Sequence, residues 1–357
     1  MSITELEPAA APATTAAATP AAAETVLGPK TNSIEGVRYL CSIAAMHTAS
    51  AIPRVIPITH CGPGCADKQY MNLAFYNGFQ GGAYGGGAAV PSSNLTEREV
   101  VFGGAERLSE LIGATLKVMD ADLFVVLTGC IPDLVGDDVP SVVGEYQKQG
   151  VPIVYAETGG FRGNNFIGHE IVTRAIIDQF VGPYDGPRQP GLVNLWTLLP
   201  YHNPFWRGDL LELKRLLEGI GLKVNLLFGP QSGGVAEWQS LPQAQFNLVL
   251  SPWLGLATAK HLEKKYGQPF LHLPAIPIGA AESARFLRRV AQFAGLDPAP
   301  VEAFITAEET FYYSYLESFT DFFAEYRWGL PTRFAVAADS AYALALTRFL
   351  VNQLGLI

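Results

Sequence analysis

Short apolar runs alternate with amphipathic stretches along most of the chain from Thr31 onward. A strand that is buried on both faces of a parallel sheet is typically a continuous apolar run of roughly four to eight residues. The segment Leu123–Thr128 (LFVVLT) is the clearest example. The same pattern predicts further strands at Val151–Tyr155, Leu192–Leu199, Lys223–Phe228, Phe246–Leu250, Phe270–Leu273 and Phe334–Ala337.

The segments between these runs have the periodicity of helices. Thr96 and Glu99 have the spacing of a capping box, which predicts a helix start just before the apolar run Val100–Phe102. Alternation of strands and helices at this spacing predicts an α/β fold of repeated, Rossmann-like, doubly wound parallel-sheet domains. The predicted helices are Val100–Met119, Asp138–Gln149, Gly168–Phe180, Asp209–Gly219, Leu256–Tyr266 and Ser283–Ala294.

Three interruptions divide the chain. The run Pro8–Glu24 is nearly all Ala, Pro and Thr, which favours disorder. Proline and glycine interrupt the pattern again at Gly182–Gly191 and near Trp328–Pro331. These breaks predict a disordered tail at 1–28, a first Rossmann-like domain at 29–185, a second at 186–330 and the start of a third, incomplete domain at 331–357.

The composition narrows the class of protein. Apolar residues make up 49% of the chain and charged residues 16%, which favours large buried sheets and subunit contacts over disorder. The net charge of −9 argues against nucleic acid as the main partner. No run approaches the roughly eighteen apolar residues of a membrane span, and the first residues lack the basic start of a secretory signal. We therefore expect a cytoplasmic protein.

The cysteines are the strongest chemical signal. A large core makes a disulfide scaffold implausible, so metal ligation or a catalytic thiol is favoured. Cys130 follows the predicted strand Leu123–Thr128, at the edge of an open sheet where ligands gather. Cys65 closes the glycine-rich turn HCGPGC, and Cys41 precedes a predicted helix. Three distant thiols do not complete an ordinary four-cysteine iron–sulfur cluster, which indicates a ligand from another chain or a cluster shared across an interface. Scattered structural cysteines are the alternative.

Four segments resemble the conserved core of the nitrogenase component 1 superfamily. The resemblance implies that Cys41, Cys65 and Cys130 match the three cysteines that each subunit gives to the P-cluster, an [8Fe-7S] cluster at the subunit interface. A single [4Fe-4S] cluster is the alternative, and the first domain would be the cluster-binding one. The segments are His60–Cys65 (HCGPGC), Glu99–Gly104 (EVVFGG), Cys130–Asp138 (CIPDLVGDD) and Phe161–Gly163 with Gly168-His169.

The resemblance also indicates which subunit this is. In α-type subunits a cysteine after a strand of the second domain binds the catalytic cofactor, whereas this chain has Ser251 at or beside that place. The chain is therefore similar to a β-type subunit. Gly160 stands where the β subunit of nitrogenase has a serine that binds the oxidised P-cluster, so that ligand switch is not expected. Cys61 is an extra thiol, either buried beside the cluster loop or an alternative fourth ligand.

The resemblance implies the partners and the reaction. We expect an α2β2 heterotetramer with an α-type subunit that carries the catalytic iron cofactor, and an ATP-dependent iron–sulfur reductase that supplies electrons. Among such oxidoreductases the chain resembles methylthio-alkane reductase, which reductively cleaves C–S bonds in small organic sulfides. Nitrogenase proper, a tetrapyrrole reductase subunit and a scaffold for cofactor assembly are the alternatives.

Other polar and aromatic residues have less specific interpretations, and none predicts acid–base catalysis. His60 either donates a hydrogen bond to cluster sulfur or is a satisfied loop histidine. His169 is expected to anchor the domain, and Asp137 and Asp138 to cap a helix rather than form an acid–base pair. Gly81–Gly87 is a closely packed or mobile loop and not a phosphate loop. Aromatic residues at helical spacing predict a helix packed on the core or on a partner: Phe311, Tyr312, Tyr313, Tyr315, Phe319, Phe322 and Phe323.

Overall fold

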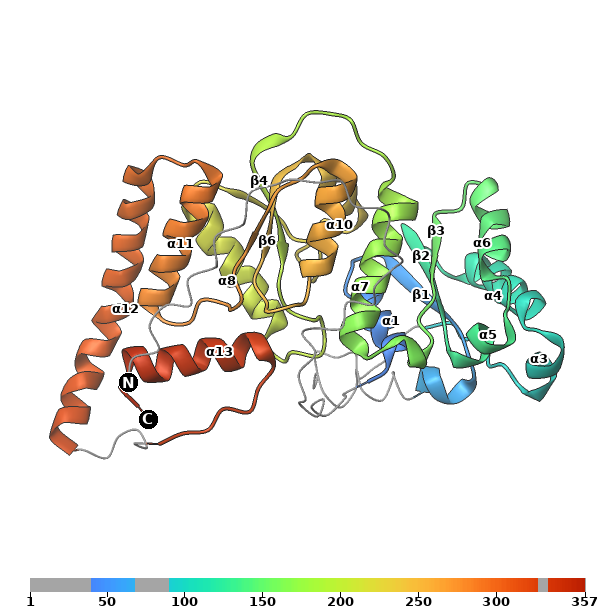
Figure 1. Cartoon of the computed structure of the whole chain (residues 1–357), viewed down its shortest axis with the longest axis horizontal. Helices are drawn as coiled ribbons and strands as arrows, with labels where there is room; N and C mark the ends of the chain where they lie inside the picture. Colours follow the sequence, from blue (N-terminus) through green and yellow to red (C-terminus); the bar gives the residue numbers. More distant parts are fainter. Residues whose placement is uncertain (1–39, 68–89, 327–332, 357) are drawn as a thin grey trace, which may run out of the picture.

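The computed structural model describes residues 40–67, 90–326 and 333–356 (Figure 1). The predicted tail at 1–28 and the glycine-rich loop Gly81–Gly87 lie outside these residues. Two parallel sheets with helices packed against them make up the described part of the chain, which confirms the predicted α/β fold. No helix among the described residues has the length and apolar character that crossing a membrane requires.

The first sheet positions two of the cysteine-bearing segments. Its strands are β1 (Val55–His60), β2 (Leu123–Thr128) and β3 (Ile153–Ala156), in the order β1-β2-β3 and all parallel. His60 and Thr128, the last residues of β1 and β2, are paired across the sheet. The chain therefore leaves two neighbouring strand ends toward Cys65 and toward Cys130.

Helices cover both faces of this sheet: α1 (Ala45–Ser50), α4 (Ala105–Val118), α6 (Val139–Lys148) and α7 (Asn165–Ile176). Because successive residues of a strand point to opposite faces, Phe124 and Val126 pack with α4 and α6, while Val125 and Leu127 pack in a larger core on the other face. That larger core continues into the second sheet, and α7 lies between the two sheets (Figure 1).

The second sheet is also entirely parallel, in the order β5-β4-β6-β7. Its centre holds a row of buried amides, because Asn194 of β4 is paired with Asn225 of β5 on one side and with Asn247 of β6 on the other. The strands are β4 (Gln189–Trp196), β5 (Lys223–Asn225), β6 (Ala244–Val249) and β7 (Phe270–His272). The helices around them are α8 (Trp206–Gly219), α9 (Val235–Ser240), α10 (Leu256–Tyr266), α11 (Ala280–Ala294) and α12 (Pro298–Tyr326).

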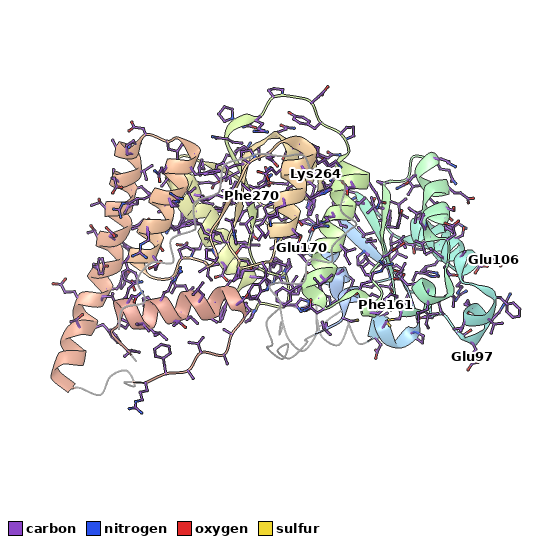
Figure 2. The ribbon with its side chains drawn as sticks, in the orientation of Figure 1. Glu97, Glu106, Phe161, Glu170, Lys264 and Phe270 are labelled. Carbon is purple, nitrogen blue, oxygen red and sulfur yellow. The ribbon has the colours of Figure 1, made fainter. Side chains whose placement is uncertain are left out.

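Polar contacts join the two sheets through α7. The carboxylate of Glu170 on α7 accepts a hydrogen bond of 3.0 Å from the backbone N–H of Thr258 in the first turn of α10. The Thr173 hydroxyl lies 3.0 Å from the Thr258 hydroxyl. Figure 2 shows Glu170 between the two sheets. A buried carboxylate at a helix N-terminus compensates N–H groups that have no partner within the helix.

Two sequence predictions of helix and strand are wrong. The predicted helix Val100–Met119 is two helices, α3 (Glu97–Phe102) and α4, because Gly103 takes a left-handed conformation with φ of 88° and ends the first. The capping box at Thr96 is confirmed. The predicted strand Phe334–Ala337 has no strand pairing among the described residues and leads into α13 (Ser340–Arg348). That residues 331–357 begin a third domain stays a prediction.

Candidate metal centre

Cys41 lies on a segment that is bound to the loop after β3. It forms an isolated antiparallel bridge with Asn164. The next residue, Ser42, is buried, and its hydroxyl lies 2.9 Å from the carbonyl oxygen of Thr158 and 2.6 Å from that of Gly159. These contacts fix the segment beside the loop while Cys41 itself is exposed. An exposed thiol on a fixed backbone is available to a ligand that extends beyond this chain.

Cys130 begins the short helix α5 (Cys130–Val135), directly after β2. Its sulfur accepts a hydrogen bond of 3.1 Å from the backbone N–H of Gly160. Two hydrogen bonds between Thr158 and Thr128, of 3.0 and 2.9 Å, hold the loop after β3 against the end of β2. A backbone N–H directed at the sulfur stabilises its thiolate form, which is the form that binds metal.

Gly160 is the point where the segments of Cys41 and Cys130 meet. A Cβ atom at this position would lie 3.1 Å from the Cys130 sulfur, 3.3 Å from Cys41 Cβ and 3.6 Å from the Cys41 sulfur. The first of these distances is tighter than ordinary van der Waals contact. Glycine therefore lets the backbone approach both thiols, and the two sulfurs share the space in front of its amide.

Cys65 completes the cysteine site, which we define as Cys41, Cys65 and Cys130. It lies in the helical segment 63–67 that follows β1 and is partly exposed. Burial raises the pKa of Cys41, and the negative charges of Cys65 and Cys130 raise it further. The three sulfurs are therefore close enough to repel one another as thiolates, and a bound cationic centre relieves that repulsion.

The geometry does not fit a single metal ion held by this chain alone. Within residues 40–67, 90–326 and 333–356, no group of three or more His, Cys, Asp or Glu side chains is arranged around one ion. Thiolates prefer soft centres such as iron bridged by sulfide, and a polynuclear cluster spans more widely spaced ligands than one ion does. The three cysteines and the glycine backbone of the site fit a cluster whose remaining ligands come from another chain.

Cys61, the fourth cysteine, lies buried beneath the cysteine site. A hydrogen bond with the side chain of Cys65 is the main reason that its pKa is lowered to about 7. A Cβ atom at Gly129 would lie 2.5 Å from Cys61 Cβ, so the thiol packs under the residue that precedes Cys130. Its burial fits a structural thiol beside the cluster loop, and its contact with Cys65 keeps the fourth-ligand alternative open.

His60 is a satisfied histidine and does not donate to sulfur. Its Nδ1 atom lies 3.1 Å from the Ser93 hydroxyl, and its Nε2 atom lies 3.0 Å from Oδ2 of Asp137. Both ring nitrogens therefore have protein partners. Burial lowers the pKa of His60, and the neighbouring Asp137 carboxylate opposes that shift only in part. Of the two interpretations drawn from the sequence, the satisfied loop histidine is the one observed.

The two adjacent aspartates have different roles. Asp138 caps α6, because its carboxylate accepts a hydrogen bond of 3.1 Å from the backbone N–H of Ser141. The capping prediction is wrong for Asp137, whose Oδ1 atom accepts a hydrogen bond of 2.7 Å from the N–H of Gly104 and whose Oδ2 atom contacts His60. The sequence did not reveal these partners because they are far from Asp137 along the chain.

A cluster of buried histidines lies between the sheets and was partly missed. His169 lies 2.9 Å from the Thr48 hydroxyl, and burial lowers its pKa to about 3, which supports an anchoring rather than a catalytic role. His47 and His202 contact each other through ring nitrogens 2.8 Å apart. Burial also places the pKa of His202 well below its usual value. At the matching cofactor position, Ser251 is buried and its hydroxyl accepts a hydrogen bond of 3.2 Å from the Leu254 N–H.

An apolar surface lies on the elements around the cysteine site. We call it the apolar patch and define it as Val101, Phe102, Leu134 and Phe161, which are 72%, 83%, 74% and 58% exposed. The helices α3 and α5 that carry the first three contact each other, and Phe161 follows Gly160 (Figure 2). Exposed apolar side chains gathered in one region indicate a surface that another protein covers.

The model of the family described as nitrogenase component 1 type oxidoreductase matches residues 41–357. The chain belongs to this family. Among its relatives, the B-type subunit of the light-independent protochlorophyllide reductase of Angiopteris evecta is 26% identical over 287 residues, which are 74% of this chain and 53% of that protein. The nitrogenase molybdenum-iron protein beta chain of Klebsiella pneumoniae is 25% identical over 336 residues, 88% of this chain and 59% of its own length. These relatives are oxidoreductases of the beta type, as the sequence predicted.

Solved structures show the same fold. A structure of nitrogenase Cp1 at pH 6.5 superposes with a TM-score of 0.65 at 24% sequence identity, covering 83% of this chain and 56% of the solved chain. The chain spans about half the length of the curated relatives that it matches.

Proposed function

We propose that this chain is the β-type subunit of a nitrogenase-like reductase and that its cysteine site holds half of an [8Fe-7S] cluster shared with an α-type subunit. The observation that carries the proposal is the meeting of Cys41 and Cys130 at the Gly160 backbone, with the Cys65 charge acting on Cys41. A [4Fe-4S] cluster is the alternative cofactor.

The chain's own residues would bind and position the cluster. Cys41, Cys65 and Cys130 provide thiolates, and the N–H of Gly160 stabilises the charge on the Cys130 sulfur. Buried Cys61 and the strand ends beneath the site exclude water from that side. When bound, such a cluster supplies one-electron redox chemistry between an ATP-dependent iron–sulfur reductase and the catalytic iron cofactor of the α-type partner.

The surface around the site supports a partner chain. Cys41 is exposed although a cluster ligand needs shielding from water, and the apolar patch lies on neighbouring elements. An α-type subunit seated there would cover both, and two such pairs would give an α2β2 heterotetramer. Ser251 offers no thiolate to a catalytic cofactor, so substrate reduction is proposed to take place in the α-type partner.

For the substrate we propose small organic sulfides, whose C–S bonds would be cleaved reductively. The second candidate is a tetrapyrrole, because relatives such as the protein of Angiopteris evecta are protochlorophyllide reductase subunits. Anaerobic co-expression with the partner subunit, followed by iron analysis per heterodimer, separates the two cofactors because an [8Fe-7S] cluster has twice the iron of a [4Fe-4S] cluster. Turnover of each substrate class with the reductase then identifies the reaction.

The cysteine site is tested by a matched pair of variants. Cys65→Ala removes a proposed ligand, whereas Cys61→Ala makes the same change at the buried thiol four positions earlier. Loss of iron and of the paramagnetic signal in Cys65→Ala alone supports the proposal. Full retention of iron in Cys65→Ala contradicts it, and loss in both variants would identify Cys61 as a further ligand.

A further inference from the structure

Polar side chains that are not proposed ligands connect the cysteine-bearing segments to one another. Ser42, next to Cys41, donates to the loop after β3. In that loop Arg162 donates from Nε to Asp133 of α5 at 2.9 Å, and the Asp133 side chain is 4% exposed. The Cys41 segment is thus linked to the Gly160 loop, and the Gly160 loop to the helix that begins at Cys130.

Asp137 provides the remaining connection, from the Cys130 helix to the Cys65 loop. It follows α5, and its Oδ2 atom lies 3.0 Å from Nε2 of His60, the last residue of β1. Its Oδ1 atom accepts the N–H of Gly104 at 2.7 Å, at the turn between α3 and α4. One carboxylate therefore contacts three segments that are separate in the sequence.

The surroundings of Asp137 are shaped for this contact. Its side chain is 3% exposed and that of His60 is 0% exposed. A Cβ atom at Gly104 would lie 2.7 Å from Oδ2 of Asp137 and 3.0 Å from Cε1 of His60, so only glycine lets this amide reach the carboxylate. Burying a carboxylate is unfavourable unless its hydrogen bonds are satisfied, and an apolar residue would serve stability as well. The buried acid is therefore better explained by the geometry that it imposes.

We infer that Asp137 is a positioning residue of the cysteine site: it holds the Cys65 loop, the Cys130 helix and the α3–α4 turn in fixed relative positions before a cluster binds. The inference rests on the proposed function in one respect, namely that the positioned cysteines receive a cluster. The arrangement of the three segments is a property of the chain itself and can be measured without iron.

Two substitutions separate the geometry of Asp137 from its charge. Asp137→Ala removes both hydrogen-bond acceptors. Asp137→Asn keeps an oxygen for the Gly104 N–H and presents an amide N–H to Nε2 of His60, so it removes the charge and keeps both contacts. Asp138→Ala is the matched control, because this neighbouring carboxylate is exposed and caps α6 only. Gly104→Ala disturbs the same contact from the other side with the carboxylate intact.

Hydrogen exchange of the full chain, purified without iron, tests the inference first. We expect Asp137→Ala and Gly104→Ala to speed amide exchange across residues 97–104 by about tenfold, with Asp137→Asn and Asp138→Ala close to the parent chain. In the loaded complex, Asp137→Ala should shift the paramagnetic signal and the midpoint potential, and Asp137→Asn should restore the signal.

Two results would overturn the inference: exchange in Asp137→Ala equal to that of the parent chain, or Asp137→Asn as disruptive as Asp137→Ala, which would assign the role to charge. Failure of the proposed function has a different signature. In that case Cys65→Ala retains all of its iron, while the exchange differences among the Asp137 variants are unaffected.

Discussion

The backbone N–H of Gly160 donates a hydrogen bond of 3.1 Å to the sulfur of Cys130, and a side chain at Gly160 would contact the same sulfur. A loop that lacks a side chain at one position thereby brings an amide to a thiol 30 residues away in the sequence. The contact also explains why the chain departs from the nitrogenase β subunit here: a serine would have to displace Cys130 or Cys41 slightly.

Substitution of Gly160 tests this close approach. Gly160→Ala and Gly160→Ser both place a Cβ atom against the Cys130 sulfur, and we expect each to cost about 1–3 kcal/mol of unfolding free energy. Chemical denaturation of the iron-free chain measures the cost. Only Gly160→Ser adds an oxygen that can ligate iron, so the oxidised complex of this variant alone should show a changed paramagnetic signal. Equal spectra for the two variants would exclude ligation by the serine.

The apolar patch should govern association with the α-type subunit. We expect Phe102→Asp and Phe161→Asp to weaken that association at least about tenfold, because each introduces a charge into a surface that the partner is proposed to cover. Val118→Asp is the control: this residue is 80% exposed at the end of α4, just before β2 begins, and thus at the opposite edge of the sheet. Binding measured by surface plasmon resonance that is equal for all three variants would contradict the assignment.

The row of buried asparagines should stabilise the second sheet. Asn194 donates to Asn247 at 3.0 Å and accepts from Asn225 at 2.8 Å. Because Asn194→Ala leaves two buried amides without a partner, we expect it to lower the unfolding free energy by about 2–4 kcal/mol in urea denaturation. Gln292→Ala, an amide removed from the exposed face of α11, should cost less than about 0.5 kcal/mol. Similar values for the two variants would show that the row is not a stabilising network.

The buried His169 should make stability depend on pH. Burial lowers its pKa from 6.5 to about 3, so the unfolded chain binds this proton more readily than the folded chain. Its contribution is complete above about pH 6.5 and is lost as the pH falls, by up to about 1.4 kcal/mol per pH unit. Urea denaturation at pH 7.5 and 5.5 should show a smaller loss in His169→Gln than in the parent chain, whereas the half-buried His261→Gln should show the parent's loss. An unchanged pH dependence in His169→Gln would refute the burial effect.

The sequence predicted some elements well because local pattern and tertiary environment agree in them. Leu123–Thr128 is apolar at nearly every position and is buried on both faces, so β2 has the predicted bounds, as α10 does. The strand β1 was not predicted because Pro57 interrupts its pattern. A proline is tolerated there because β1 is the last strand of its sheet, where one side needs no backbone donor.

The missed features depend on contacts between distant residues. Asparagine disfavours strands locally, yet Asn194 is stabilised by amides from two neighbouring strands. Asp137 looks like a helix cap until the fold brings His60 to it across 77 positions. The prediction that the aromatic residues of α12 pack on the core is wrong for Phe311 and Tyr315, which are 63% and 68% exposed. The partner alternative stays a prediction, and the side chains of Phe322 and Phe323 lie outside the described residues.

The most direct test of the cysteine site is anomalous X-ray scattering at the iron absorption edge, recorded from crystals of the complex grown without oxygen. We predict one iron cluster between this chain and its partner, bonded to the sulfur atoms of Cys41, Cys65 and Cys130. Iron absent from the boundary between the chains, with these three thiols unligated, would contradict the cysteine site as a cluster site.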